Sequence, residues 1–123
     1  MLLNNRKSIA LLFIPLLIFA GLSGNAIAQS MDDEIDYLID RVGRDGCSFF
    51  RNERLYVGSD ARSHLRSKLR RNAHLVNSTE DFIVKLASTS ATTGRAYIIR
   101  CRGLDDQNAL NWFNALITEY RQN

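Results

Sequence analysis

The sequence is poor in the residues that build catalytic and metal centres. It holds only two histidines and two cysteines, and His64 and His74 have no neighbouring cysteine to share a metal with once the cysteines pair. Because a structural zinc site uses four such ligands, we predict no metal and no other cofactor. Neither Ser88 nor Ser90 lies in a Gly-x-Ser-x-Gly elbow, so the local sequence that surrounds many hydrolase serines is missing as well.

Long apolar runs are also scarce. The run from Ile9 to Leu22 follows a short cationic head and precedes Ala26-Ile27-Ala28, which is the pattern of a cleavable secretory signal. It is shorter than the roughly 20 apolar residues of a membrane-spanning helix, and Pro15 interrupts it. We therefore expect a signal peptide at 1–28, cleavage after Ala28, a periplasmic location and no stable membrane insertion of the mature chain.

Charge is nearly balanced in the remaining part of the chain. Without Arg6 and Lys7, 14 basic residues face 13 acidic ones. The distribution is uneven, because residues 29–50 hold six acids and two bases whereas residues 51–102 hold eleven bases and four acids. Such a basic middle suits an anionic partner, for example a phosphate-rich envelope polymer, but it is more typical of a solvated helix face. A nucleic-acid partner is not expected.

The part after the signal contains nothing that divides it into two units. Residues 29–123 have no internal repeat, no low-complexity linker and no proline, and their number suits one small domain with one core. Alternating residues predict strands at 47–51, 54–57 and 95–102. The first two strands form a hairpin around Asn52-Glu53. This turn is imperfect, because a two-residue hairpin turn favours positive φ at both positions and Glu53 resists that conformation.

Apolar residues at helical spacing predict about four helices. They begin at Ser30, at Ala61, after Ser78 and after the cap at 103–105. The last helix carries the strongest apolar stripe, and we expect it in the core with Phe82. The stripe consists of Ala109, Trp112, Phe113, Leu116, Ile117 and Tyr120.

The two cysteines connect the predicted strands. Cys47 begins the first strand and Cys101 ends the third, and an oxidising compartment lets a disulfide between them persist. The bridge is made most easily if these strands are antiparallel neighbours. The predicted fold is therefore α+β, with a three-stranded antiparallel sheet in the order second, first, third, covered by about four helices.

An ordered set of short motifs resembles a known family. The motifs are Phe49-Phe50-Arg51-Asn52, Ala61-x-x-His64-Leu65-Arg66-x-Lys68, Phe82-Ile83, Ala87-Ser88-x-Ser90, Thr93-Gly94 and Tyr97-x-Ile99. Over residues 35–120 the chain resembles the YfeK-like family of small exported bacterial proteins, a domain of unknown function. The resemblance implies an exported single domain and no particular activity. Glu53, where the family tends to Gly, and Ala96, where Pro is common, depart from its pattern.

Lys68 is the most informative polar residue. Helical spacing places it inside the apolar arc of its helix, where a lysine has to pair with an acid, bond to the Ser/Thr-rich joint after residue 87, or meet a ligand. If Lys68 is only structural, we expect Lys68→Met to keep or raise stability. The ligand hypothesis is a small polar pocket for a carboxylate or phosphate. Its residues are Arg51, His64, Lys68 and Ser90.

These observations favour a non-enzymatic binding or interaction module of the cell envelope, whose partner is an anionic small molecule or envelope component. The alternative is a small periplasmic hydrolase in which His64 serves as the base for Ser88 or Ser90. A hydrogen bond between His64 and Ser90, with an acid behind the histidine, would favour the enzyme.

Overall fold

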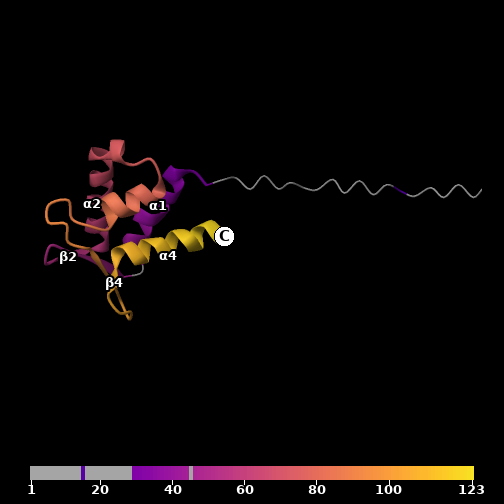
Figure 1. The fold of residues 1–123 in the computed structure, drawn as a ribbon. Coiled ribbons are helices and arrows are strands. Elements are labelled where there is room, and N and C mark those ends of the chain that lie inside the picture. Colours follow the sequence, from indigo (N-terminus) through magenta and orange to yellow (C-terminus); the bar gives the residue numbers. More distant parts are fainter. Residues whose placement is uncertain (1–14, 16–28, 45) are drawn as a thin grey trace, which may run out of the picture.

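The computed structural model describes residues 29–44 and 46–123, together with Pro15 (Figure 1). The predicted signal peptide and its cleavage site therefore lie outside the described residues, Pro15 excepted. The described part of the chain forms four α-helices, a 3-10 helix, a π-helix and a four-stranded antiparallel sheet. This confirms the predicted α+β class. No helix in this part is long and apolar enough to cross a membrane.

The first helix forms as its sequence predicts. Helix α1 spans Met31–Val42, and the Ser30 hydroxyl caps it by accepting a hydrogen bond from the Asp33 amide at 3.1 Å. Acidic residues occupy its first turn, where the positive end of the helix dipole stabilises them. Its apolar stripe is buried in the core.

The β-hairpin follows directly. Strand β1 spans Cys47–Arg51 and strand β2 spans Arg54–Val57. Asn52 and Glu53 have φ values of 48° and 64°, so both turn residues take the left-handed conformation of a two-residue hairpin turn. The hairpin is confirmed, and Glu53 holds a backbone conformation that its side chain disfavours.

Helix α2 and the segment after it differ in detail from prediction. Helix α2 spans Gly58–Arg71 and so begins three residues before the predicted start at Ala61. Gly58 allows the start of α2 to approach the end of α1 closely, because a Cβ at Gly58 would lie 2.8 Å from the Val42 carbonyl oxygen. The 3-10 helix η1, Ala73–Leu75, occupies the predicted linker.

The third helix changes type along its length. Helix α3 spans Thr79–Asp81 and is capped by the Ser78 hydroxyl, as predicted, and the chain then continues as the π-helix η2, Phe82–Ala87. The joint after it turns at Gly94, whose amide donates to the Ser90 carbonyl at 2.8 Å. Gly94 has φ 70°, a conformation that glycine adopts without strain.

The predicted three-stranded sheet is wrong by one strand. Strand β3 spans Ile98–Cys101, and a further strand β4, Gln107–Asn108, pairs with it, so the order is β2-β1-β3-β4. The predicted order of the first three strands is correct. Two residues are too few to show alternation, and they lie just after the predicted cap at 103–105, where the sequence indicates the start of the last helix. The actual cap of α4, Ala109–Gln122, is Asn108.

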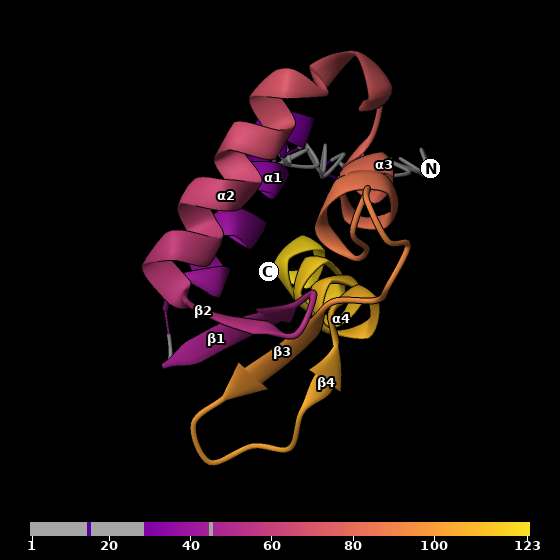
Figure 2. The ribbon, with the colours of Figure 1, turned by 90° about the vertical axis from the view of Figure 1, so that its left-hand side faces the viewer.

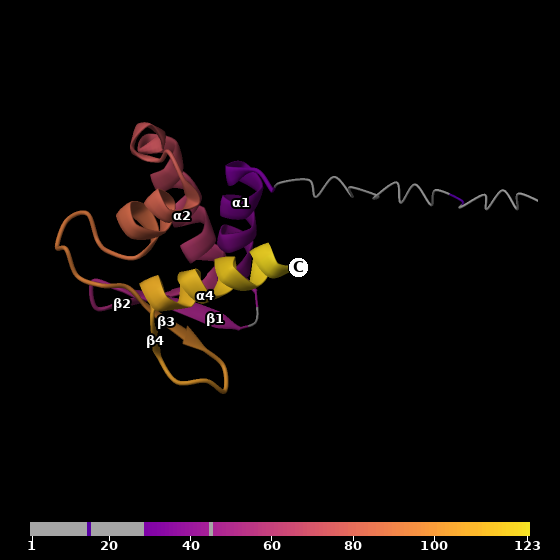
Figure 3. The ribbon, with the colours of Figure 1, turned by 45° about the vertical axis from the view of Figure 1, so that its right-hand side comes forward.

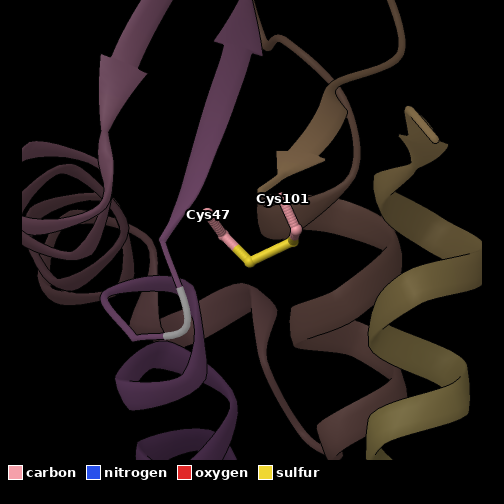
Figure 4. Close-up of a disulfide and its surroundings, with 2 residues drawn as sticks. All are labelled: Cys47 and Cys101. Atoms are coloured by element: carbon pink, nitrogen blue, oxygen red, sulfur yellow. A yellow bond between two sulfur atoms is a disulfide. The ribbon is translucent and has the colours of Figure 1, made fainter. Parts of the chain in front are cut away.

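The helices lie on one face of the sheet (Figures 2 and 3). Between the two layers lies a single core, to which the sheet contributes Phe49 and Ile99, and α4 contributes Trp112 and Phe113. The predicted disulfide is confirmed: Cys47 and Cys101 are paired positions of β1 and β3, and their sulfurs are bonded at 2.09 Å (Figure 4). The bridge closes the end of the sheet opposite the hairpin turn.

Candidate functional site

The hydroxyl of Tyr97 brings two cationic side chains together. Tyr97 lies just before β3, and its side chain points into the core, where the residue is 1% exposed. Its hydroxyl oxygen accepts hydrogen bonds from Arg51 Nε at 3.1 Å and from Lys68 Nζ at 3.2 Å. Both cations also lie beside the aromatic ring, 5.8 and 5.2 Å from its centroid. The Tyr97 hydroxyl thus links a side chain of strand β1 to a side chain of helix α2.

Lys68 is fully engaged by the protein. The residue is 5% exposed, and its ammonium also donates to the Leu86 carbonyl at 2.8 Å and the Thr89 carbonyl at 3.0 Å. This confirms the expectation that the ammonium reaches carbonyls near the joint. An ammonium has three N–H groups, and all three are used here. Lys68 therefore ties η2 to the sheet and has no donor left for a ligand.

Arg51 differs from Lys68 in this respect. Its Nε is held by Tyr97, and its guanidinium lies 5.7 Å from the centre of the Tyr56 ring. Its two terminal nitrogens make no hydrogen bond or ion pair with any residue that the structure describes. Arg51 is half-buried at the rim of the sheet. A guanidinium fixed at Nε with both terminal nitrogens unpaired matches the geometry of a carboxylate or phosphate.

His64 completes the group on the α2 side. Its ring stacks on Tyr56, with centroids 6.5 Å apart and planes inclined by 19°. Its Nε2 is buried and has no hydrogen-bond partner within the described part of the chain. Burial lowers the pKa of His64, and the positive charges of Arg51, Lys68 and Arg71 lower it further. The neutral imidazole is therefore favoured, whereas an anion bound beside it would favour the protonated form.

The two serines of the hydrolase hypothesis have other partners. The Ser88 hydroxyl donates to the Ile83 carbonyl, five residues back rather than the four that a regular helix predicts. Ser90 Oγ accepts from Asn52 Nδ2 at 3.2 Å and from the amides of Thr92 and Thr93, each at 3.3 Å. Ser90 thus holds the joint against the hairpin turn. Among the described residues, neither serine hydrogen bonds to His64.

The structure adds residues that the sequence did not single out for the site. The Tyr97 hydroxyl accepts hydrogen bonds from Arg51 and Lys68, and the Tyr56 ring stacks on His64. No local pattern could identify Tyr97, because its two cationic partners come from 46 and 29 positions away. Within the described ranges, no cluster of three metal-ligating side chains forms, and no pocket is present, either at the Arg51 and His64 group or away from it.

A second buried charge lies at the other end of the helical layer. Glu34 of α1 accepts hydrogen bonds from the Thr79 hydroxyl at 2.8 Å and from Arg121 Nη2 at 3.0 Å. Arg121 also donates to Glu80. The hydrogen bond from Arg121 lowers the pKa of Glu34, and burial opposes this shift. The bonds from Thr79 and from Arg121 Nη2 both end on Oε1, and Arg121 Nε donates to Oε2. Both oxygens of the carboxylate are therefore satisfied, and Glu34 ties α4 to α1 and α3.

Comparison with known proteins identifies one family that the sequence matches. The model of a family of unknown function, DUF5329, matches residues 29–121. No curated protein and no solved structure matches the chain. The match covers nearly all of the predicted mature chain and gives no activity for any of its residues.

Proposed function

The chain belongs to this family of unknown function, and from that premise we propose that it is an exported, non-enzymatic binding module of the cell envelope that holds an anionic group at Arg51. The YfeK-like name, the bacterial envelope and the cleaved signal are part of the proposal. The Cys47–Cys101 disulfide supports export, because disulfides persist in oxidising compartments.

The observation that carries the proposal is the state of Arg51. Tyr97 orients the guanidinium through Nε, and the terminal nitrogens have no partner in the described part of the chain. A cation that is already oriented loses less side-chain entropy when an anion binds. His64, beside it, gains a favourable neighbour when negative charge arrives. We assign Lys68 the supporting role of holding Tyr97 in place.

The test is binding of inorganic phosphate and of acetate to the mature protein, measured as a rise in the melting temperature. An anion that binds only the native state raises it in proportion to RT ln(1 + [L]/Kd). We expect a rise for wild type and none for Arg51→Gln. Arg51→Lys should keep only part of it, because a lysine lacks the planar fork.

Arg102→Gln is the matched control, since it removes the same charge from an exposed residue at the opposite end of the sheet. It should respond to the anions as wild type does. An equal response of wild type and Arg51→Gln, or no response of wild type to either anion, would refute the site. Export is tested separately by mass spectrometry of the natural protein, which should begin at Gln29. A retained Met1 would overturn the signal peptide.

A further inference from the structure

Three arginines of the hairpin and α2 have no carboxylate partner in the described part of the chain. Five other basic side chains do form ion pairs: Arg66 with Asp36 and Asp40, Lys85 with Asp81, Arg95 with Glu53, Arg100 with Asp106, and Arg121 with Glu34 and Glu80. By contrast, Arg51, Arg54 and Arg71 have no ion-pair partner among the described residues. We call these three residues the hairpin cation surface.

Two of the three arginines face each other across the hairpin. Arg51 and Arg54 are register partners in β1 and β2, and the Cα atoms of such a hydrogen-bonded pair lie about 5.5 Å apart. Their side chains leave the same face of the sheet, and like charges directly opposite destabilise a hairpin. The acid in the turn does not neutralise them, because Glu53 Oε1 is paired with Arg95 at 3.0 Å.

Arg71 brings the third charge to this face. Helix α2 rises from the end of β2 on the covered side of the sheet (Figure 2). His64, Lys68 and Arg71 follow one another at i, i+4 and i+7, so they share one side of the helix. His64 is stacked on the hairpin residue Tyr56, and Arg71 lies near enough to lower the pKa of His64.

We propose that the hairpin cation surface binds a polymer of repeated phosphate groups rather than a single small anion. This inference rests on the proposed function and adds the class of ligand. One phosphate satisfies one guanidinium fork, which leaves Arg54 and Arg71 uncompensated. A chain of phosphates supplies a counter-charge to each, and it relieves the repulsion between Arg51 and Arg54 that the fold otherwise carries.

The experiment measures binding of linear inorganic polyphosphate to the mature protein at several salt concentrations. For three phosphate contacts on a flexible chain, the slope of log K against log salt should be about −2, at about 0.7 per contact. Arg54→Gln and Arg71→Gln should each reduce the magnitude of this slope by about 0.7. Both residues are exposed, so these variants should fold as wild type does. Arg102→Gln, the control, should leave the slope unchanged.

The outcomes separate this inference from the proposed function. If inorganic phosphate binds at Arg51 but Arg54→Gln and Arg71→Gln bind polyphosphate as wild type does, the polymer inference is wrong and the Arg51 site stands. If Arg51→Gln binds both anions as wild type does, the Arg51 site is wrong as well. Vesicles containing phosphatidylglycerol test the lipid source of the same chemistry. Binding to these vesicles without binding to polyphosphate would overturn the polymer assignment.

Discussion

Replacing Lys68 with methionine removes one buried charge and the three hydrogen bonds that it donates. The Leu86 carbonyl, the Thr89 carbonyl and the Tyr97 hydroxyl each lose the hydrogen bond that the ammonium donates at 2.8, 3.0 and 3.2 Å. Methionine is of similar length and apolar, so it fills the space of the stem without making those bonds. The sequence alone suggested that this change would keep or raise stability, and the contacts reverse that expectation.

The magnitude follows from these contacts. Hydrogen bonds to a charged group contribute about 1.5–3 kcal/mol each, and an acceptor left buried without a partner costs about 1–3 kcal/mol. Part of this loss is offset, because the folded protein no longer has to dehydrate an ammonium. We expect Lys68→Met to lower the free energy of unfolding by about 2–4 kcal/mol, a large share of the 5–15 kcal/mol that is typical of such a domain.

Urea unfolding followed by circular dichroism measures the change. Lys85→Met is the matched control, since Lys85 lies on the π-helix η2 that Lys68 contacts and has a side chain that is 46% exposed. An exposed pair contributes little, so the control should unfold near the wild-type midpoint. If Lys68→Met were as stable as wild type or more so, the three hydrogen bonds would not contribute as argued, and the structural role of Lys68 would be refuted.

Three further predictions concern other contacts. Glu53→Gly should raise the free energy of unfolding by about 0.5–1 kcal/mol, because glycine adopts the positive φ at this turn without strain; a lower urea midpoint would contradict this. The lowered pKa of His64 means that the unfolded chain binds its proton more tightly, so stability should be full above pH 6.5 or so and fall as the pH drops below it. In His64→Gln the urea midpoint should vary less with pH across this range. If the midpoint of the variant depended on pH as that of wild type does, His64 would not be the cause of the pH dependence. Arg121→Met leaves the buried Glu34 carboxylate without its cation and should cost about 1–3 kcal/mol, a range reduced for the partial exposure of Arg121. The pKa of Glu34 should rise with it in an NMR titration, and an unchanged pKa would show that Arg121 does not hold it down.

Local patterns in the sequence were sufficient for much of the fold. Ser30 and Ser78 mark helix starts because a capping hydroxyl acts within three residues of itself, and the stripe of α4 repeats often enough to reveal its buried face. The disulfide followed from the placement of two cysteines at strand ends. The strand β4 and the π-helix could not be predicted. The strand β4 has too few residues to show the alternation of buried and exposed side chains that identifies a strand. The π-helix differs from an α-helix only in which backbone carbonyl accepts the hydrogen bond of each amide.

The candidate site was predictable only in part. Arg51 and His64 were named from motifs and charge, and the structure places both around Tyr56. Ser90 was placed with them by helical spacing, but the helix ends before it and the serine turns toward Asn52. The role of Tyr97 depends on contacts between residues far apart in the chain, which no local pattern contains.

The central claim is that an anion binds between Arg51 and His64. Its most direct test is the NMR titration of the His64 ring in the absence and presence of inorganic phosphate. Without the anion, the pKa of His64 should lie below its ordinary value, because burial and three neighbouring cations disfavour the imidazolium. Phosphate bound at Arg51 brings negative charge beside the ring and should raise this pKa in wild type, with no change in Arg51→Gln. A His64 pKa that phosphate leaves unchanged in wild type would contradict the account.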